Sequence, residues 1–173
     1  AVGEAAGAAQ LASDMTAVGY HAATLSTVAA TAVGSGALDA NTTGLYNTAV
    51  GASALGANQT GDNNVAIGHN ALQVATGIGN IAVGAFAGDA ISSGLYNVAI
   101  GDYALSSAST STQSVAIGRN TATLANVAVT AIGALALDAL TSGAGNTGVG
   151  YNALSVVATG TNNTAVGESA NAV

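Results

Sequence analysis

A four-residue phrase recurs along this chain of 173 residues. It reads Thr, Val or Ile, then Ala (once Gly), then Val or Ile, and it closes on Gly. The closing glycines are Gly19, Gly34, Gly51, Gly68, Gly84, Gly101, Gly118, Gly133, Gly150 and Gly167. Successive copies stand 15 to 17 residues apart, which is the signature of a repeat architecture. Because a pair of helices needs roughly twice this length, each unit must be built from strands.

Polar residues and a second glycine recur before the phrase. Asn stands four residues before the closing Gly at Asn47, Asn64, Asn80, Asn97, Asn146 and Asn163, where stacked coils would align the amides in a hydrogen-bonded ladder. Three residues earlier stand Gly44, Gly61, Gly77, Gly94, Gly143 and Gly160. We expect a second turn with positive φ there, with Asn126 as the substitute in one short coil. The pattern predicts an all-β fold, a parallel β-solenoid or β-roll with about eleven coils.

Both faces of the predicted strands are apolar. The first and third residues of the phrase share one face, and the Ala between them lies on the other. A strand with one solvent-facing side normally alternates apolar with polar residues. We expect the Thr, Val and Ile face to fill the interior of the coil and the Ala row to lie outside, covered by a neighbouring chain. The sequence therefore predicts an elongated homotrimer.

Composition limits the partners. Half of the residues are hydrophobic, 5% are charged, and the formal net charge is −7 with a single Lys or Arg. Such a surface repels nucleic acid and anionic lipid, and it is too poor in charge for a small monomer unless much of it is covered. Polar residues and Gly interrupt every apolar stretch before about 18 residues, so we expect no membrane insertion by this segment.

The whole range 1–173 is predicted to be one repetitive segment of a longer fibre. Coils in 1–40 are degenerate and those in 41–173 are regular. The short coils lead into Gly34, Gly84 and Gly133, and the residues five places later are Asp39, Asp89 and Asp138. This defines a three-coil super-repeat near 34–83, 84–132 and 133–173.

Two sets of phrases resemble known families. Thr43 to Gly51 and Thr159 to Gly167 resemble the 17-residue repeats of bacteriophage tail fibres, while Asn64 to Gly68 and Ser114 to Gly118 are similar to head repeats of trimeric autotransporter adhesins. The resemblance covers almost all of the chain, and residues 1–40 match more loosely. It implies a left-handed parallel β-roll, threefold symmetry and an extracellular role in adsorption, on a virion tail or a cell-surface appendage. It implies no catalytic residues.

Catalytic and cofactor interpretations find little support. The stretch from Gly143 to Gly148 spells the dinucleotide-binding fingerprint, but the strand before it and the helix after it that this motif requires are missing. His21 and His69 stand far apart in a chain without Cys, so a zinc site within one chain is not expected. Arg119 is expected to pair with Asp102 one coil away. We therefore expect no enzyme activity, no cofactor and no metal.

Three classes of function remain at this stage. The leading one is a structural segment of a trimeric phage tail fibre or similar fibrous appendage, a rigid spacer in host attachment whose partners are other virion or appendage proteins. The second is an autotransporter adhesin head that binds host surface or matrix, a cell-surface glycan or protein. The third is an ice-binding solenoid, disfavoured because Thr gives way to Val and Ile in the middle coils. The candidate surface contacts are Tyr20, Tyr46, Tyr96, Tyr103 and Tyr151.

Overall fold

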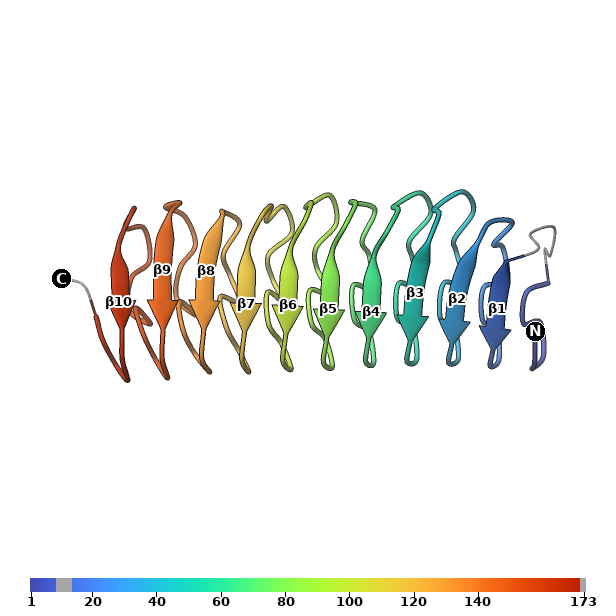
Figure 1. Cartoon of the computed structure of the whole chain (residues 1–173), viewed down its shortest axis with the longest axis horizontal. Helices are drawn as coiled ribbons and strands as arrows, with labels where there is room; N and C mark the ends of the chain where they lie inside the picture. Colours follow the sequence, from blue (N-terminus) through green and yellow to red (C-terminus); the bar gives the residue numbers. More distant parts are fainter. Residues whose placement is uncertain (9–13, 172–173) are drawn as a thin grey trace.

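The computed structural model describes residues 1–8 and 14–171, and it forms a rod of stacked coils (Figure 1). Ten short strands pair in chain order into one sheet, and every pair is parallel. The strands are β1 (Met15–Val18), β2 (Ala30–Val33), β3 (Asn47–Val50), β4 (Val65–Ile67), β5 (Ile81–Val83), β6 (Val98–Ile100), β7 (Val115–Ile117), β8 (Val129–Ile132), β9 (Asn146–Val149) and β10 (Thr164–Val166). The fold is a parallel β-solenoid of about nine turns.

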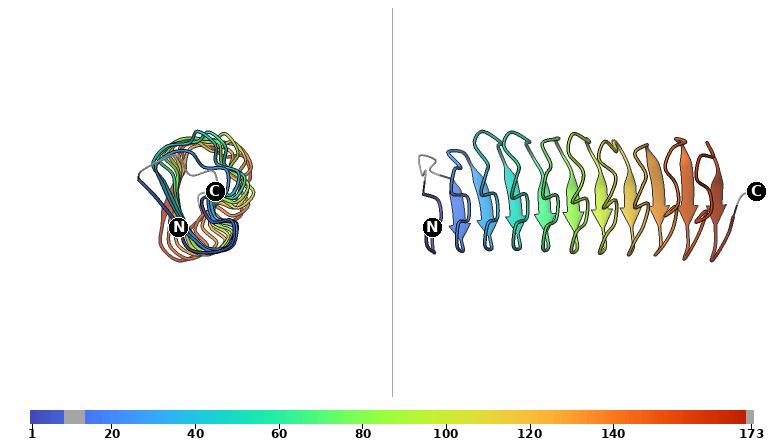
Figure 2. Two further views of the ribbon diagram at one scale, coloured as in Figure 1. Left: turned by 90° about the vertical axis from the view of Figure 1, so that its right-hand side faces the viewer. Right: turned by 180° about the vertical axis from the view of Figure 1, so that it is seen from behind.

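The register follows the phrase without a slip. Thr48 pairs with Val65, Ala49 with Ala66, and Val50 with Ile67, and the same alignment holds along the sheet. Viewed along the rod, the coils superpose with a gradual rotation (Figure 2). The predicted count of about eleven coils included the phrase that ends at Gly3. In the structure Val2 contributes only an isolated bridge to Val18 instead of a strand.

The Ala row lies inside the coil, which corrects the prediction from the sequence. Ala49, Ala66 and Ala99 are at most 1% exposed, whereas the flanking Val50 and Ile67 lie on the outer face with 36% and 41% of their surface exposed. The reason is the width of the interior. A Cβ built on Gly148, in the Ala row, would already lie 3.4 Å from Leu137 Cγ.

The segment after each closing Gly supplies the other half of the core. The residues three and four places after the Gly, such as Ala54 and Leu55, are both fully buried. Successive side chains of a strand point to opposite faces, so two consecutive inward residues require another backbone conformation. The chain meets this requirement with a left-handed backbone conformation at the second and fourth residues after the Gly, as at Ser53 (φ 55°) and Leu55 (φ 49°). Leu with positive φ is rare, and here it recurs from coil to coil.

The closing glycines are required for both conformation and space. Gly101 has φ 123°, and a Cβ there would lie 2.6 Å from the carbonyl carbon of Gly118 in the next coil. Gly84 and Gly118 meet the following coil in the same way. Successive coils therefore stack backbone on backbone along this edge.

The second glycine position differs from the prediction. Of these residues only Gly143 has positive φ, at 100°, and Asn126 is not in the left-handed region. Glycine is needed there for space, because a Cβ on Gly61 would lie 2.8 Å from Asn58 Oδ1 and 3.0 Å from Asn64 Nδ2. Left-handed residues occur two places later, at Tyr46, Asn63, Gly79, Tyr96, Gly145 and Asn162.

The Asn side chains form a ladder inside the coil. Asn80 Oδ1 accepts hydrogen bonds from the backbone N–H and the Nδ2 of Asn97, both at 3.0 Å, and Asn80 Nδ2 donates to the Gly94 carbonyl at 2.9 Å. Ser114 takes the same position with its hydroxyl, which donates to the Val127 carbonyl and accepts from Val129 N–H. Each rung therefore satisfies polar backbone groups of the next coil, which would otherwise be buried without a partner.

A second buried polar column was not predicted from the sequence. Asn41 and Asn58 are fully buried, and Asn58 Nδ2 donates to Asn41 Oδ1 at 3.3 Å. Each of these amides also closes its own turn, since Asn58 Oδ1 accepts the N–H of Gly61 and its Nδ2 donates to the Gly61 carbonyl. In later coils this column changes to apolar residues, among them Ile91 and Leu140.

Candidate interaction surface

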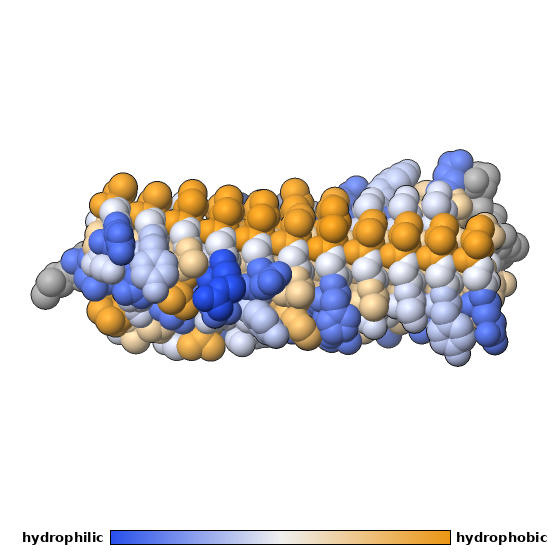
Figure 3. Space-filling view, turned by 90° about the horizontal axis from the view of Figure 1, so that it is seen from below, coloured by the Kyte–Doolittle hydropathy of each residue, from blue (hydrophilic) through white to orange (hydrophobic). Residues whose placement is uncertain are grey.

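The outer face of the sheet carries a continuous apolar row along the rod (Figure 3). We call this face the apolar stripe; it consists of the outward first and third residues of each phrase. Its members are Thr16, Val18, Thr31, Val33, Thr48, Val50, Val65, Ile67, Ile81, Val83, Val98, Ile100, Val115, Ile117, Thr130, Ile132, Thr147, Val149, Thr164 and Val166. No charged residue belongs to it. An apolar face of this length is far more continuous than the scattered hydrophobic residues of an ordinary soluble surface.

Two polar flanks border the stripe. The N-terminal flank consists of the residues just before each strand, including Asp14, Asp62 and Gln113. The C-terminal flank consists of the first two residues after each closing Gly, and it carries both His residues and several charged residues, among them Asp102 and Arg119. In Figure 3 a band of polar and charged side chains runs beside the apolar row. An apolar centre with a polar rim is the anatomy of a protein interface.

Three rings stack on successive coils of the C-terminal flank. His69 meets Phe86 edge to face, with centroids 5.0 Å apart, and Phe86 is stacked on Tyr103 at 5.0 Å with an interplanar angle of 9°. The separation matches the distance between coils, so the Phe86 and Tyr103 rings lie across the rod, while the His69 ring is perpendicular to them. A sugar that stacks on an aromatic ring needs a free face, and Phe86 and Tyr103 use one face on each other. The arrangement therefore favours packing along the rod.

The tyrosines predicted as surface contacts are all exposed. Their exposed fractions are 55% for Tyr20, 67% for Tyr46, 59% for Tyr96, 45% for Tyr103 and 53% for Tyr151. Tyr46 and Tyr96 belong to the N-terminal flank, and the other three belong to the C-terminal flank. The structure thus separates them onto the two sides of the stripe.

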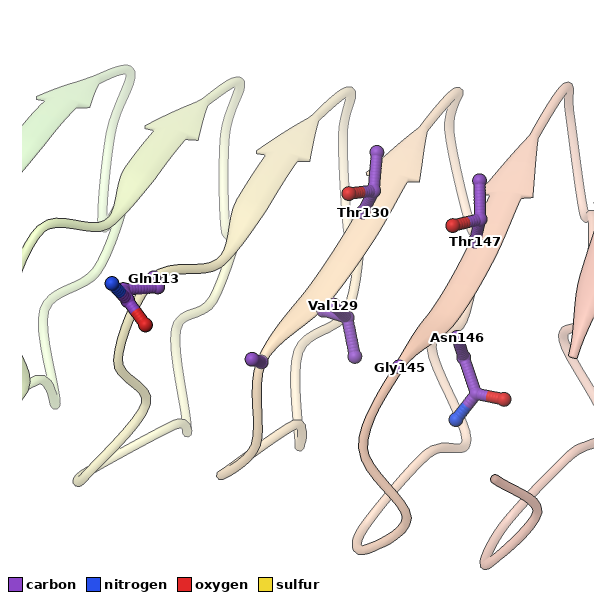
Figure 4. Close-up of a pocket in the computed structure, with 7 residues that line it drawn as sticks. Gln113, Val129, Thr130, Gly145, Asn146 and Thr147 are labelled. Atoms are coloured by element: carbon purple, nitrogen blue, oxygen red, sulfur yellow. The ribbon is translucent and has the colours of Figure 1, made fainter. Parts of the chain in front are cut away.

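Two open hollows lie on the N-terminal flank. One, of about 210 Å³, is lined by Gln113, Thr130 and Thr147 together with residues at the starts of β8 and β9 (Figure 4). The other, of about 250 Å³, lies six coils away, at the starts of β2 and β3 beside Asp14 and Tyr46. Both hollows occur where the flank carries a small residue, Ala or Gly, between larger ones. Neither hollow was predicted from the sequence.

Two carboxyl groups of the super-repeat are poorly solvated. Burial raises the pKa of Asp89 and Asp138 above 3.8, although a backbone N–H of each residue partly offsets this effect. In each, Oδ1 is buried without a hydrogen-bond partner. Asp39, the third member, lies instead 3.9 Å from His21 Nδ1. The three equivalent carboxylates therefore have different surroundings.

Replacing Asp89 by Asn is expected to stabilise the protein at neutral pH. Because the pKa is raised in the folded state, the stability that protonation gives is fully present below pH 3.8 and is lost as the pH rises through the folded pKa. The Asn variant should gain about 0.5 kcal/mol or less at pH 7, because solvent screens this partly exposed carboxylate, and the gain should vanish near pH 3. Urea denaturation at the two pH values tests this. The exposed Glu168→Gln serves as the control, and an equal gain from that change would contradict the explanation.

The remaining candidate ligands do not assemble. Within residues 1–8 and 14–171, no group of three His, Cys, Asp or Glu side chains is placed to hold a metal ion. In the same ranges the only ion pair is His21 with Asp39, so Arg119 does not pair with Asp102, whose Oδ1 accepts Ala85 N–H instead at 3.0 Å. The stretch Gly143 to Gly148 runs from a turn into β9, with no helix after it. Over the described chain, no helix is long and apolar enough to cross a membrane.

The fold defines the class of this chain: it is a parallel β-solenoid repeat protein with one outward sheet face. No family model, no curated protein and no solved structure matches it. Its function must therefore be argued from the solenoid itself.

Proposed function

We propose that this chain is a structural segment of a trimeric fibre, a phage tail fibre or similar extracellular appendage, in which it acts as a rigid spacer in host attachment. The observation that carries the proposal is the apolar stripe. It runs along the whole sheet, it holds no charge, and its central residue Ile67 is 41% exposed in the single chain. The parallel β-solenoid agrees with the β-roll that the resemblance to phage and adhesin repeats implies, and this agreement supports the proposal.

Three chains arranged about an axis parallel to the rod remove the stripe from water. Each sheet then faces the axis, the flanks border the contact with the neighbouring chains, and the turns form the outside. The arrangement also explains the composition, since a chain with 5% charged residues needs much of its surface covered. Rows of Val and Ile at matched heights give the interdigitating apolar core typical of permanent homo-oligomers.

Placing one charge in the stripe is expected to dissociate the assembly. Ile67→Asp puts three carboxylates near the axis, and burying uncompensated charge costs roughly 3–5 kcal/mol, so a folded monomer should result. The matched control is Leu124→Asp, because Leu124 is also 41% exposed but lies on a turn away from the stripe. Sedimentation equilibrium gives the mass, and circular dichroism reports the fold. A wild-type chain that is monomeric at micromolar concentration would overturn the proposed function.

The outward Thr and Val rows also favour a second candidate, an ice-binding face. Thr16, Thr31 and Thr48 begin one column of a regular parallel sheet, and Val18, Val33 and Val50 form the column beside it. One face cannot bind ice and pack around a threefold axis at the same time. A monomeric rod with thermal hysteresis would support ice binding, and a trimer without hysteresis would exclude it.

A further inference from the structure

The two hollows and the exposed tyrosines of the opposite flank are complementary. The residue directly after the closing Gly is Tyr in two coils only, at Tyr20 and Tyr151, and both side chains are more than half exposed. Tyr20 belongs to the coil of β1 and Tyr151 to the coil of β9. The hollows span β1 to β3 and β7 to β9, so each tyrosine stands at the height of one hollow.

Rotation about a threefold axis brings different flanks together. Contacts within a ring of identical chains are heterologous, so the N-terminal flank of one chain meets the C-terminal flank of the next. The heights of the tyrosines and the hollows also limit how far one chain can be displaced along the rod relative to its neighbour. Tyr20 stays level with the hollow beside Asp14 when the neighbour is displaced by zero to two coils in one direction. Tyr151 stays level with the hollow beside Gln113 when the displacement is zero to two coils in the opposite direction. Only a shift of zero satisfies both.

We propose that Tyr20 and Tyr151 of each chain insert into the two hollows of the neighbouring copy, with the chains in register. The proposal rests on the proposed trimeric function and specifies its contacts. Hollows of about 210 and 250 Å³ have room for a phenol ring, since about 150 Å³ holds a benzene molecule. Their polar side chains, Gln113 in one and Asp14 in the other, provide hydrogen-bond acceptors for the phenol hydroxyl.

Two hydrogen-bonding residues of the flanks agree with a shift of zero. His69 lies on the C-terminal flank of the β4 coil, and Asp62 lies on the N-terminal flank of the same coil. Asp62 Oδ1 accepts the Leu45 N–H at 2.7 Å, which holds the carboxylate at this edge. In register, the neighbour's copy of His69 therefore faces Asp62.

Crosslinking tests the register, because the chain has no Cys of its own. In the double variant Asp62→Cys with His69→Cys, the two thiols of one chain lie about 20 Å apart across the strand, so a short bifunctional thiol reagent joins only different chains. We expect covalent trimers on a denaturing gel. The displaced pair Asp62→Cys with Asp102→Cys, two coils off register by about 10 Å, should give a much lower yield.

Substitution tests the tyrosines. Tyr151→Ala should raise the dissociation constant of the trimer at least tenfold, because truncated tyrosine anchors commonly cost more than about 1.4 kcal/mol. Tyr103→Ala, on the same flank but at a height without a hollow, should change it less than threefold. Equal effects, or a higher yield from the displaced cysteine pair, would overturn this inference while leaving a trimer in place. A monomeric wild-type chain would overturn both this inference and the proposed function.

Discussion

Gly101→Ala is expected to destabilise the solenoid by roughly 3–6 kcal/mol, in the range where assembly or expression fails. Two effects add. The residue has φ 123°, which L-amino acids rarely adopt, and the new Cβ would lie 2.6 Å from both the carbonyl carbon and oxygen of Gly118. These atoms belong to the backbone, so no side chain can rotate away. The coils must separate locally, which breaks the parallel ladder between β6 and β7.

A control compares this loss with the loss at a glycine of positive φ in open space. Gly36 also has positive φ, at 66°, but a Cβ there meets only Ser53 Oγ, at 3.6 Å. Gly36→Ala should therefore lose about 1 kcal/mol, from backbone strain alone. Thermal and urea denaturation followed by circular dichroism compare the two variants. If both lose the same stability, then backbone contact between coils does not explain the closing glycines.

The repeat spacing predicted the strands well and their orientation badly. Every regular phrase from Thr16 to Val166 forms a strand, because apolar β-branched residues and a closing Gly at fixed spacing leave the backbone little choice. The period of two also separated the two faces correctly. It did not say which face is inside, because both faces are apolar and the usual apolar and polar contrast is absent.

Side-chain volume decides the orientation. The interior already holds a Leu in most coils, such as Leu55 and Leu105, so only Ala fits opposite it. Where Leu is replaced by Gly88, Ile91 fills the space, since its Cδ1 would lie 3.0 Å from a Cβ on that glycine. The constant small side chain of the Ala row thus indicated the inward face. The same volume argument now makes the Val and Ile row the surface that a partner covers.

The left-handed turn residues had no signal in the sequence. Glycine marks positive φ in ordinary turns, yet here Leu38, Leu55 and Leu72 adopt φ values of 48° to 52°. Leu prefers negative φ. This preference is outweighed by the burial of two consecutive side chains and by hydrogen bonds to both neighbouring coils.

Asn80→Ala is expected to cost roughly 3–5 kcal/mol, because it removes a fully buried rung of the ladder. The change leaves the N–H of Asn97 and the carbonyl of Gly94 without their partners, and it opens a small cavity. Neither group can reach water inside the coil. The melting temperature should fall by roughly 10 °C.

Asn80→Ser is the matched variant, because Ser occurs naturally in this column. Ser114 donates to the Val127 carbonyl at 2.9 Å and accepts the Val129 N–H at 3.2 Å, the two bonds that a rung must supply to the next coil. Asn80→Ser should therefore lose only about 1 kcal/mol, mostly from lost packing. Denaturation of both variants in the same oligomeric state separates hydrogen bonding from volume. Similar losses for Ala and Ser would mean that the ladder stabilises the coil by filling space, and that its amides could be replaced by any side chain of equal size.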